Sequence, residues 1–307
     1  METKDINVSI IIPTLNEEKN IEDTLQRIVN QKKEFIHNNI KYVVAPHIIV
    51  VDSGSTDNTI NIIKKFSKNF PWIEVYLVPR FHHSITRNFG AKKSKGDILV
   101  FLNADAKPVD AVWLINLIAP LIKSYAASFS RQIAPKGLIS VDSLLASTGF
   151  PPNSATIDKH NFNKYFSRYG VLLSSVSCGI KRRIFFEIGG FNKYVPINED
   201  QELAFRLLKS GYKIFYAANS RVFHAHKDGF IATPRRYYRY GVGWKIIQRI
   251  HRDFRQEYSM DTFKSVLKAL FTESTNGTYR MAMSLKRLKT FIYGAIAFFS
   301  ALIGRYL

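Results

Sequence analysis

The stretch that decides the fold is Ile-Ile-Val-Val-Asp-Ser-Gly-Ser-Thr-Asp, residues 48–57, in which four β-branched residues lead directly into a polar turn. A short run of β-branched residues that ends at turn residues is typical of a buried strand. Gly54 permits a tight turn, Ser55 or Thr56 can cap a helix, and Asp57 favours the positive N-terminal end of that helix. The stretch therefore predicts a buried strand followed at once by a helix.

The same alternation of strand and helix fills the first third of the chain. Strands are predicted at residues 8–12, 48–51, 73–78 and 98–102, and helices at residues 20–31, 57–66, 84–93 and 110–123. This pattern is typical of an α/β protein whose mostly parallel sheet has helices on both faces. Ligands of such sheets bind beyond the carboxyl ends of the strands, so the residues just after each strand are the first candidates for a site.

The remaining sequence predicts further strands and then a helical part. Strands are expected at residues 126–133, 174–180 and 213–217, with a helix at 200–210 that Gly211 ends. From residue 234 the pattern is helical, with helices predicted at 234–253, at 261–271 and from 284 onward. We therefore expect one α/β domain over residues 1–230 and a helical extension over residues 231–307.

Composition narrows the classes of protein that fit. Cys178 is the single cysteine, which excludes an internal disulfide and favours a reducing compartment. The formal net charge is +20, and residues 227–307 hold 15 Lys and Arg against 5 Asp and Glu, a net charge of +10. Such an excess favours a polyanionic partner. No helix-turn-helix, zinc-finger or aromatic-platform pattern is present, so we expect an anionic membrane surface and not nucleic acid.

Acidic and amide side chains follow three of the predicted strands and begin one later helix. They are Asn16 and Glu17, Asp52, Asn103 and Asp105, and the pair Glu199 and Asp200. Each can simply cap the next helix, a role that short polar side chains often fill. A carboxylate fixed at the end of a buried strand can instead hold Mg²⁺ or Mn²⁺ beside diphosphate oxygens. Taken singly, these motifs leave both interpretations open.

Taken together, the motifs resemble in order and spacing those of family 2 glycosyltransferases, which have the nucleotide-sugar-binding GT-A fold. The resemblance covers residues 8–230. It rests on Pro-Thr-Leu-Asn-Glu (13–17), Asp-Ser-Gly-Ser-Thr-Asp (52–57), Arg-Asn-Phe-Gly (87–90), Gly-Asp (96–97), Asn-Ala-Asp (103–105), Gly-Gly-Phe (189–191) and Glu-Asp (199–200). It implies a GT-A domain, whose mixed, mostly parallel sheet is flanked by helices, followed here by a C-terminal helical, membrane-associating extension. It also implies an inverting transferase, a nucleoside-diphosphate-sugar donor and a divalent metal, Mg²⁺ or Mn²⁺.

The resemblance also implies roles for individual residues. Asp200 would be the general base that deprotonates the acceptor for an in-line displacement, and Asp105 would hold the metal. His224 follows the last sheet strand, where some family members supply a metal-ligating histidine. The alternative is an imidazole that is hydrogen-bonded within the protein or faces solvent. The implied substrate-binding and nucleotide-binding residues are Pro13, Thr14, Asn16, Glu17, Asp52, Ser53, Gly54, Arg87, Asn103, Ala104, Glu199, Arg236 and Arg239.

The sequence departs from the pattern of the family at two places. The metal motif is usually Asp-X-Asp, and here Asn103 takes the first position, which keeps an oxygen but loses the charge. Arg236 and Arg239 loosely keep the spacing of the Gln-X-X-Arg-Trp motif of processive synthases, but Tyr240 replaces the Trp and no Gln is present. The second departure disfavours processive polymer synthesis, and a solvated basic helix is the alternative there.

The last segment favours an acceptor close to a membrane. Residues 291–304 form an uncharged run, shorter than the roughly 20 apolar residues of a membrane span. Such a run suits an interfacial or re-entrant anchor, with a buried core helix as the alternative.

The N-terminus has no secretory signal pattern. We therefore expect an enzyme at the cytoplasmic face of the membrane with a lipid-linked or glycan acceptor. The alternatives are a soluble glycan or protein glycosyltransferase and a catalytically inactive adaptor.

Overall fold

The computed structural model describes residues 1–135, 140, 149–225, 232–253, 299–300 and 303. The chain forms two compact units. The first consists of Met1–Arg131, Pro152–Lys159 and Leu173–Phe223, and the second of Gln132–Pro151, His160–Leu172 and His224–Leu307. The first unit carries the sheet and most of the predicted site residues.

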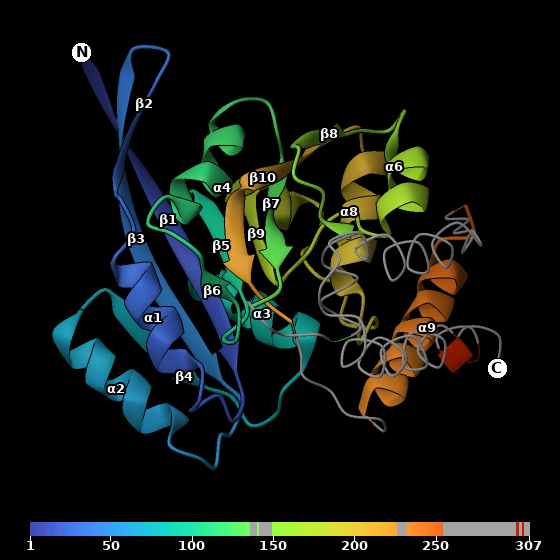
Figure 1. The fold of residues 1–307 in the computed structure, drawn as a ribbon, viewed down its shortest axis with the longest axis horizontal. Helices are drawn as coiled ribbons and strands as arrows, with labels where there is room; N and C mark the ends of the chain where they lie inside the picture. The colour runs from blue at the N-terminus through green and yellow to red at the C-terminus, as the bar shows by residue number, and fades with distance from the viewer. Residues whose placement is uncertain (136–139, 141–148, 226–231, 254–298, 301–302, 304–307) are drawn as a thin grey trace, which may run out of the picture. The chain divides into compact units, whose positions relative to one another are not determined.

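The sheet of the first unit is mixed, with its parallel strands in one half (Figure 1). In spatial order its strands are β2 (Glu34–His37), β3 (Ile40–Asp52), β1 (Glu2–Thr14), β5 (Ile98–Leu102), β9 (Ser177–Lys181), β7 (Ala127–Ile133), β10 (Ile214–Phe223) and β6 (Lys107–Pro108). In addition, β4 (Ile73–Leu77) pairs with β3, and β8 (Ala155–Ile157) pairs with β10.

The direction of the strands corrects one expectation. β4, β3, β1 and β5 are parallel neighbours, as predicted from the alternation of strands and helices. β9 pairs antiparallel with both β5 and β7, and β10 pairs antiparallel with β6 and β8. A mostly parallel sheet is therefore correct only for the half built by residues 1–102.

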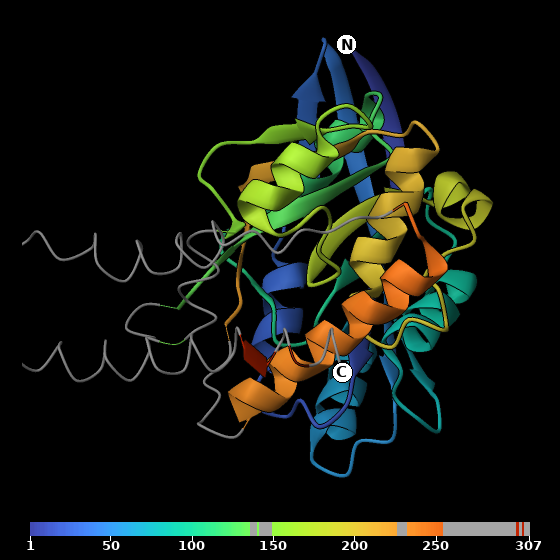
Figure 2. The ribbon, with the colours of Figure 1, turned by 90° about the vertical axis from the view of Figure 1, so that its right-hand side faces the viewer.

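The hairpin of β2 and β3 was not predicted. Asn38 and Asn39 join the two strands, and both have left-handed backbone angles, with φ of 49° and 59°. Two-residue hairpin turns favour Asn at such positions, and so short a link requires an antiparallel pair. The hairpin projects from the sheet together with the first residues of β1, as Figures 1 and 2 show.

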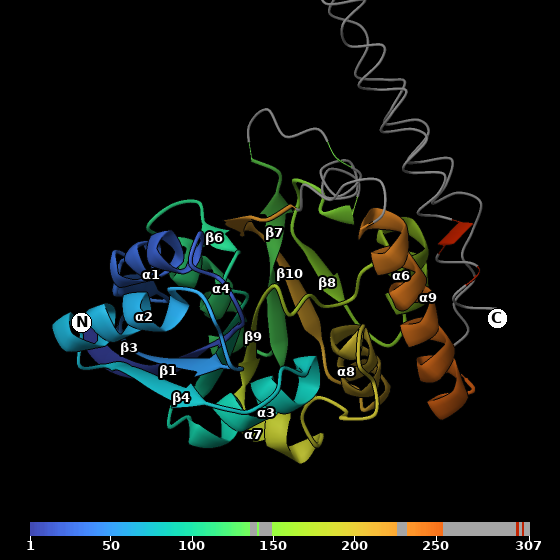
Figure 3. The same cartoon turned by 90° about the horizontal axis from the view of Figure 1, so that it is seen from below.

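Helices cover both faces of the sheet in the first unit (Figure 3). α1 (Ile21–Val29), α2 (Thr59–Asn69) and α4 (Trp113–Ile122) lie on one face, and α3 (His83–Lys93) and α7 (Arg182–Glu187) lie on the other. Successive side chains of β1 point alternately to the two faces of the sheet. Ile10 and Ile12 belong to the core that includes α1, α2 and α4, whereas Ile11 faces Gly90 of α3. Burial on both faces explains why β1 is a continuous apolar run.

The described part of the second unit contains α6 (Phe162–Tyr169) and α9 (Ala232–Ile250). The rings of Phe166 and Trp244 pack edge to face, with their centroids 5.3 Å apart. α9 confirms a helix within the predicted range 234–253, whereas the helices predicted at 261–271 and from 284, and most of the run 291–304, lie outside the described residues. Among the helices that are described, none has both the length and the apolar character needed to cross a membrane.

Candidate active site

Hydrogen bonds join the loops that follow β1 and β3. The side-chain oxygen of Asn16 accepts from the Thr56 N–H at 2.9 Å, and the Asn16 N–H donates to Ser55 Oγ at 2.8 Å. The Glu17 N–H donates to Thr59 Oγ1 at 2.7 Å. Asn16 has a φ of 55°, a left-handed conformation that Asn tolerates better than most residues. Asn16 and Glu17, which are predicted to bind the nucleotide sugar, are thus hydrogen-bonded to the loop after β3 and to the start of α2.

Asp52 is buried at the end of β3 and organises its own loop. One carboxylate oxygen accepts from the Gly54 and Ser55 N–H groups, at 3.0 and 2.9 Å. The other accepts from Thr14 Oγ1 at 3.1 Å and from Ser55 Oγ at 2.5 Å. The parallel register of β1 and β3 places Thr14 directly beside Asp52. Both oxygens therefore bond to protein groups, and Asp52 fixes the shape of this loop.

Pro13, Thr14 and Ser53 lie buried beneath the two loops. The Ser53 N–H donates to the Thr14 carbonyl at 3.0 Å, which continues the pairing of the two strands past their ends. Gly54 is exposed at the tip of the turn. Of these four predicted residues, Gly54 alone is exposed, and the other three are buried; their substrate-binding roles stay predictions.

The end of β5 carries Asn103, Ala104 and Asp105, and α1 is anchored there. Thr24 of α1 donates its hydroxyl hydrogen to the Ala104 carbonyl at 2.7 Å. Burial raises the pKa of Glu17, and the negative charge of Asp105 raises it further, against the hydrogen bond from Asn20 that lowers it. The carboxylates of Glu17 and Asp105 are therefore close enough to interact at the same edge of the sheet.

These carboxylates suit a divalent cation shared with a diphosphate. Mg²⁺ prefers oxygen ligands and is usually bound by one or two carboxylates together with substrate phosphates. Within the described ranges, no group of three or more His, Cys, Asp and Glu side chains is arranged to hold a metal ion. Asp105 is half-buried. The residues present thus fit a cation that the protein and the donor hold together.

A second carboxylate site lies at the start of α8 (Glu199–Lys209), where Asn198 has a left-handed φ of 62°. Neighbouring helical residues point about 100° apart, so Glu199 and Asp200 face different surroundings. The half-buried Asp200 accepts from the Ser175 N–H at 2.9 Å and the Gln201 N–H at 2.8 Å. Burial, and then the negative charge of Glu199, raise the pKa of Asp200 to about 6. A carboxylate with this pKa can accept a proton near neutral pH.

Arg87 of α3 joins the end of β5 to the start of α8. Its Nη1 donates to Glu199 Oε1 at 3.0 Å and to the His83 carbonyl at 3.1 Å. Its Nη2 donates to Asn103 Oδ1 at 2.7 Å. Only 2% of the Arg87 side chain is exposed. The guanidinium group, predicted from the resemblance to bind the substrate or the nucleotide, is therefore bound to protein groups beneath the surface.

The neighbouring Asn88 joins α3 to the segment before α8. Its Nδ2 donates to the Phe191 carbonyl at 2.7 Å, and its Oδ1 accepts from the Phe191 N–H at 3.0 Å. Gly190 has a φ of 67°, and a Cβ atom at this residue would lie 2.8 Å from Asn88 Oδ1. The Arg-Asn-Phe-Gly and Gly-Gly-Phe motifs thus contact each other and place α3 beside the chain that leads to Glu199.

Ser175 is a site residue that no sequence pattern singled out. Its N–H binds Asp200, and its hydroxyl donates to Glu199 Oε1 at 3.2 Å. It lies just before β9, whose antiparallel pairing with β5 continues past the strand end where the Asn103 N–H donates to the Val176 carbonyl. Ser175 lay inside the strand predicted at residues 174–180 and does not follow a strand. It reaches the site because β9 runs antiparallel to β5, which places the start of β9 beside the end of β5.

Three predicted site residues belong to the second unit. His224 Nδ1 lies 2.8 Å from Gln132 Oε1. The Arg236 guanidinium lies over the Tyr237 ring at 6.0 Å, and Arg239 is exposed on α9. A metal-binding role for His224 and a substrate-binding role for the two arginines stay predictions.

Comparison with known proteins shows the family. The model of glycosyl transferase family 2 matches residues 9–163, which is half of the chain. The O-antigen chain rhamnosyltransferase RfbN of Salmonella typhimurium is 28% identical over 260 residues, covering 81% of this chain and 76% of that protein. The O-antigen chain rhamnosyltransferase WbaN of Salmonella anatum is 31% identical over 214 residues, covering 67% of this chain and 65% of that protein.

Solved structures confirm the mixed α/β GT-A fold. A mannosyltransferase of Pyrobaculum calidifontis in complex with GDP-Man and Mn²⁺ aligns with a TM-score of 0.62 at 17% identity, covering 97% of this chain and 86% of that chain. S. aureus TarS 1-349 in complex with UDP-GlcNAc aligns with a TM-score of 0.56 at 16% identity, covering 98% of this chain and 89% of that chain. From its motifs, its fold and the matching family model, this chain belongs to glycosyl transferase family 2 and is a nucleotide-sugar-dependent glycosyltransferase.

Proposed function

We propose that this enzyme transfers a sugar from a nucleoside diphosphate to a lipid-linked glycan acceptor, with inversion at the anomeric carbon. The observation that carries the proposal is the hydrogen-bonded path from the half-buried Asp200 through Ser175, Glu199 and Arg87 to Asn103, two residues from Asp105. This path connects a candidate base with a candidate metal ligand. A single displacement needs a base on the acceptor side and charge stabilisation on the donor side.

In this mechanism Asp200 is the general base. Its carboxylate takes the proton of the acceptor hydroxyl while the acceptor oxygen attacks the anomeric carbon and the bond from that carbon to the diphosphate breaks. The Ser175 and Gln201 N–H groups hold the carboxylate in place. A pKa of about 6 leaves Asp200 mostly ionised at neutral pH, yet more basic than an ordinary aspartate. A positioned base of this kind typically contributes about 10²–10⁴-fold to the rate.

On the donor side, the loops after β1 and β3 would bind the nucleotide, with Asn16, Glu17 and the Gly54 turn nearest to it. Asp52, Pro13, Thr14 and Ser53 would act by holding these loops, because they are buried. Asp105 would bind Mg²⁺ or Mn²⁺ with the diphosphate, and a bound cation would neutralise the charge that builds up on the leaving group. For the second unit, a metal-binding role for His224 and an acceptor-binding or diphosphate-binding role for Arg236 and Arg239 remain separate parts of the proposal.

Two observations support a lipid-linked acceptor and a location at a membrane surface, and the cytoplasmic face is part of the proposal. Both relatives named above are O-antigen chain rhamnosyltransferases, which makes a nucleotide-activated rhamnose the first donor to test. The net charge of +20 favours binding to an anionic lipid surface, since each basic residue near such a surface contributes about 1 kcal/mol. A short apolar anchor within residues 291–304 remains part of this proposal.

A panel of labelled nucleotide sugars tests the proposal. The full chain is incubated with membrane extract and Mn²⁺, with and without a chelator, and the anomeric configuration of the product is determined by NMR. We expect label in the organic phase, an inverted product and loss of transfer when the chelator is present. Asp105→Asn should weaken metal-dependent donor binding in calorimetry, because it removes the charged ligand and keeps the side-chain shape.

Other outcomes of this panel would favour other functions. Label found only in water-soluble glycan or protein would replace the lipid-linked acceptor with a soluble one. Absence of nucleotide-sugar binding under every metal condition would favour a catalytically inactive adaptor and contradict the proposal. Retained configuration at the anomeric carbon would contradict the single displacement.

A further inference from the structure

We propose that the buried ion pair of Arg87 and Glu199 is a positioning element of the active site, which holds the helix that bears the base in register with the strand end that bears the metal ligand. This inference rests on the proposed function of Asp200. It assigns Arg87 and Glu199 a role through other residues, in place of the direct substrate contact predicted from the sequence.

The geometry of Arg87 is that of a bridge. The side chain comes from α3, and its two terminal nitrogens bind groups on two other elements: Asn103 after β5, at 2.7 Å, and Glu199 at the start of α8, at 3.0 Å. The planar guanidinium has its donors in a fixed fork, so the two acceptors are held at a fixed separation. A change in the position of α8 relative to β5 would break one of these bonds.

Glu199 connects Arg87 to the proposed base, Asp200. Its Oε1 accepts from Arg87 Nη1 and also from Ser175 Oγ. The N–H of the same Ser175 donates to Asp200 Oδ2 at 2.9 Å. Glu199 also precedes Asp200 directly in the chain. Two routes, one through the backbone and one through Ser175, thus connect the ion pair to the carboxylate that takes the proton.

The cost of burying this pair argues that it does more than stabilise the fold. Arg87 and Glu199 expose 2% and 5% of their side chains, and the removal of two charges from water costs several kcal/mol per ion before their attraction is counted. Hydrophobic side chains of similar size would often serve stability equally well. Besides binding each other, Arg87 binds Asn103 and Glu199 binds Ser175. Hydrophobic side chains could not form these directional bonds, which explains why the pair is ionic.

The asparagine at position 103 fits the same arrangement. Its amide oxygen accepts the second terminal nitrogen of Arg87 without adding a charge. One buried guanidinium then faces one buried carboxylate, Glu199. A second carboxylate at position 103 would leave an excess negative charge in the buried network, which is costly at low polarity. The departure from Asp-X-Asp is therefore explained by the partner of Asn103, and within this motif Asp105 is the position that keeps the metal-binding role.

The groups that face Asp200 make the proposal measurable. They are the Glu199 carboxylate and the Arg87 guanidinium, the buried Cys178 thiol of β9, and the N–H groups of Ser175 and Gln201. The charge of Glu199 raises the pKa of Asp200, and the charge of Arg87 lowers it. Neutralising one or the other should therefore move the acidic limb of the rate profile in opposite directions.

The test measures transfer rate against pH for the full chain and for variants of the pair. We expect Glu199→Gln to move the acidic limb of kcat to lower pH, and Arg87→Gln to move it to higher pH, each by about one pH unit. Arg87→Lys keeps the charge but lacks the planar fork whose two nitrogens bind Glu199 and Asn103. It should leave the limb within a few tenths of a unit of the wild type, lower the plateau kcat about tenfold and change KM for the donor much less.

Glu202→Gln is the matched control. Glu202 is also buried on α8 and pairs with Arg206 at 2.8 Å, but Arg206 otherwise binds the Ile188 and Gly190 carbonyls and not β5. This variant should lower thermal stability and leave the acidic limb unmoved. If Glu199→Gln behaves like Glu202→Gln, losing stability without a shift of the limb, the positioning role is wrong.

Two further results separate the possible failures. If Arg87→Gln does not fold, Glu199→Gln and Arg87→Lys decide, because an unmoved limb in the first with a normal kcat in the second overturns the inference. Asp200→Asn is measured in the same series. A normal rate in Asp200→Asn contradicts the proposed function itself. Loss of transfer in Asp200→Asn, together with a wild-type acidic limb and kcat in the Glu199 and Arg87 variants, contradicts only the positioning role.

Discussion

Three aspartates of this chain have the same side chain and different surroundings. Asp52 is buried and both of its oxygens accept hydrogen bonds from the protein. Asp105 and Asp200 are half-buried residues. We therefore expect Asp52 to act on the shape of its loop, and Asp105 and Asp200 to be the two that contact a metal ion and an acceptor. Residue type and spacing alone do not distinguish these roles.

Replacement of Asp52 tests its role in the loop. Asp52→Ala leaves the N–H groups of Gly54 and Ser55 and the hydroxyl of Thr14 without their acceptor, and an unsatisfied buried donor costs about 1–3 kcal/mol. We expect the free energy of unfolding in urea to fall by about this amount and donor affinity to fall with it. Asp97→Ala, at an exposed position, is the control. Unchanged unfolding with lost donor binding would instead indicate direct contact with the nucleotide.

At the scale of elements, α3 is the part that the active site depends on most. One residue of it, Arg87, binds the start of α8 and the end of β5, and the next, Asn88, binds both the N–H and the carbonyl of Phe191. Gly90 lets the helix lie close to the strands, since a Cβ atom there would be 2.4 Å from Ile11 Cγ2. The motif Arg-Asn-Phe-Gly thus sets the distance of α3 from the sheet and the direction in which Arg87 and Asn88 point.

Gly90→Ala should displace α3 from β1. Ile11 is fully buried, so the added methyl group has no space, and overpacking of this kind costs about 1–3 kcal/mol. We expect a matching loss in the free energy of unfolding and a lower transfer rate, because Arg87 moves with the helix. Lys92→Ala, exposed on the same helix, should change neither. A stable Gly90→Ala enzyme with full activity would show that the position of α3 is not critical.

The sequence predicted the elements that have strong local signals. β1, β3, β4 and β5 follow from β-branched runs, and α1 to α4 from the patterns between them. β2, β8 and α7 were missed because they are three to six residues long, too short for periodicity to show. Likewise the residues at strand ends were found from their places in the chain. The bond from Arg87 to Glu199 was not, because 112 positions separate the two residues and only the fold brings them together.

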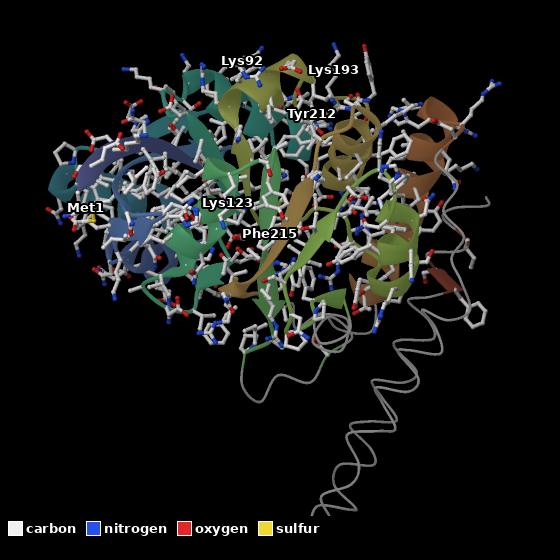
Figure 4. All side chains as sticks on the ribbon, turned by 90° about the horizontal axis from the view of Figure 1, so that it is seen from above. Met1, Lys92, Lys123, Lys193, Tyr212 and Phe215 are labelled. Carbon is white, nitrogen blue, oxygen red and sulfur yellow. The ribbon has the colours of Figure 1, made fainter. Side chains whose placement is uncertain are left out.

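At the scale of the whole molecule, charge is the dominant feature. The excess of 44 Lys and Arg over 24 Asp and Glu gives +20. Part of this charge lies on the first unit. Figure 4 shows Lys92 and Lys193 with their side chains directed outward on the side of α3 and α7, where Phe186 and Tyr194 are also exposed. Basic and aromatic side chains together are typical of surfaces that contact lipid head groups.

Membrane binding should therefore depend on lipid charge and on salt. We expect the full chain to sediment with vesicles that contain anionic lipid and to be released as the salt concentration rises from about 0.05 to about 0.5 M, because screening shortens the range of the attraction. Vesicles of neutral lipid are the control and should retain much less protein. Equal binding to neutral and anionic vesicles at every salt concentration would show that apolar insertion, and not charge, dominates.

The dependence of transfer rate on pH, measured for the wild type and for Asp200→Asn, tests the role of Asp200 most directly. Because the pKa of Asp200 is raised to about 6, the base is protonated below that pH. The wild-type rate should rise about tenfold per pH unit below the pKa and level off above it. In Asp200→Asn we expect this rise to disappear and the plateau to fall by about 10²–10⁴-fold, with donor affinity nearly unchanged. A variant that transfers sugar at the wild-type rate, with the same rise near pH 6, would contradict this role.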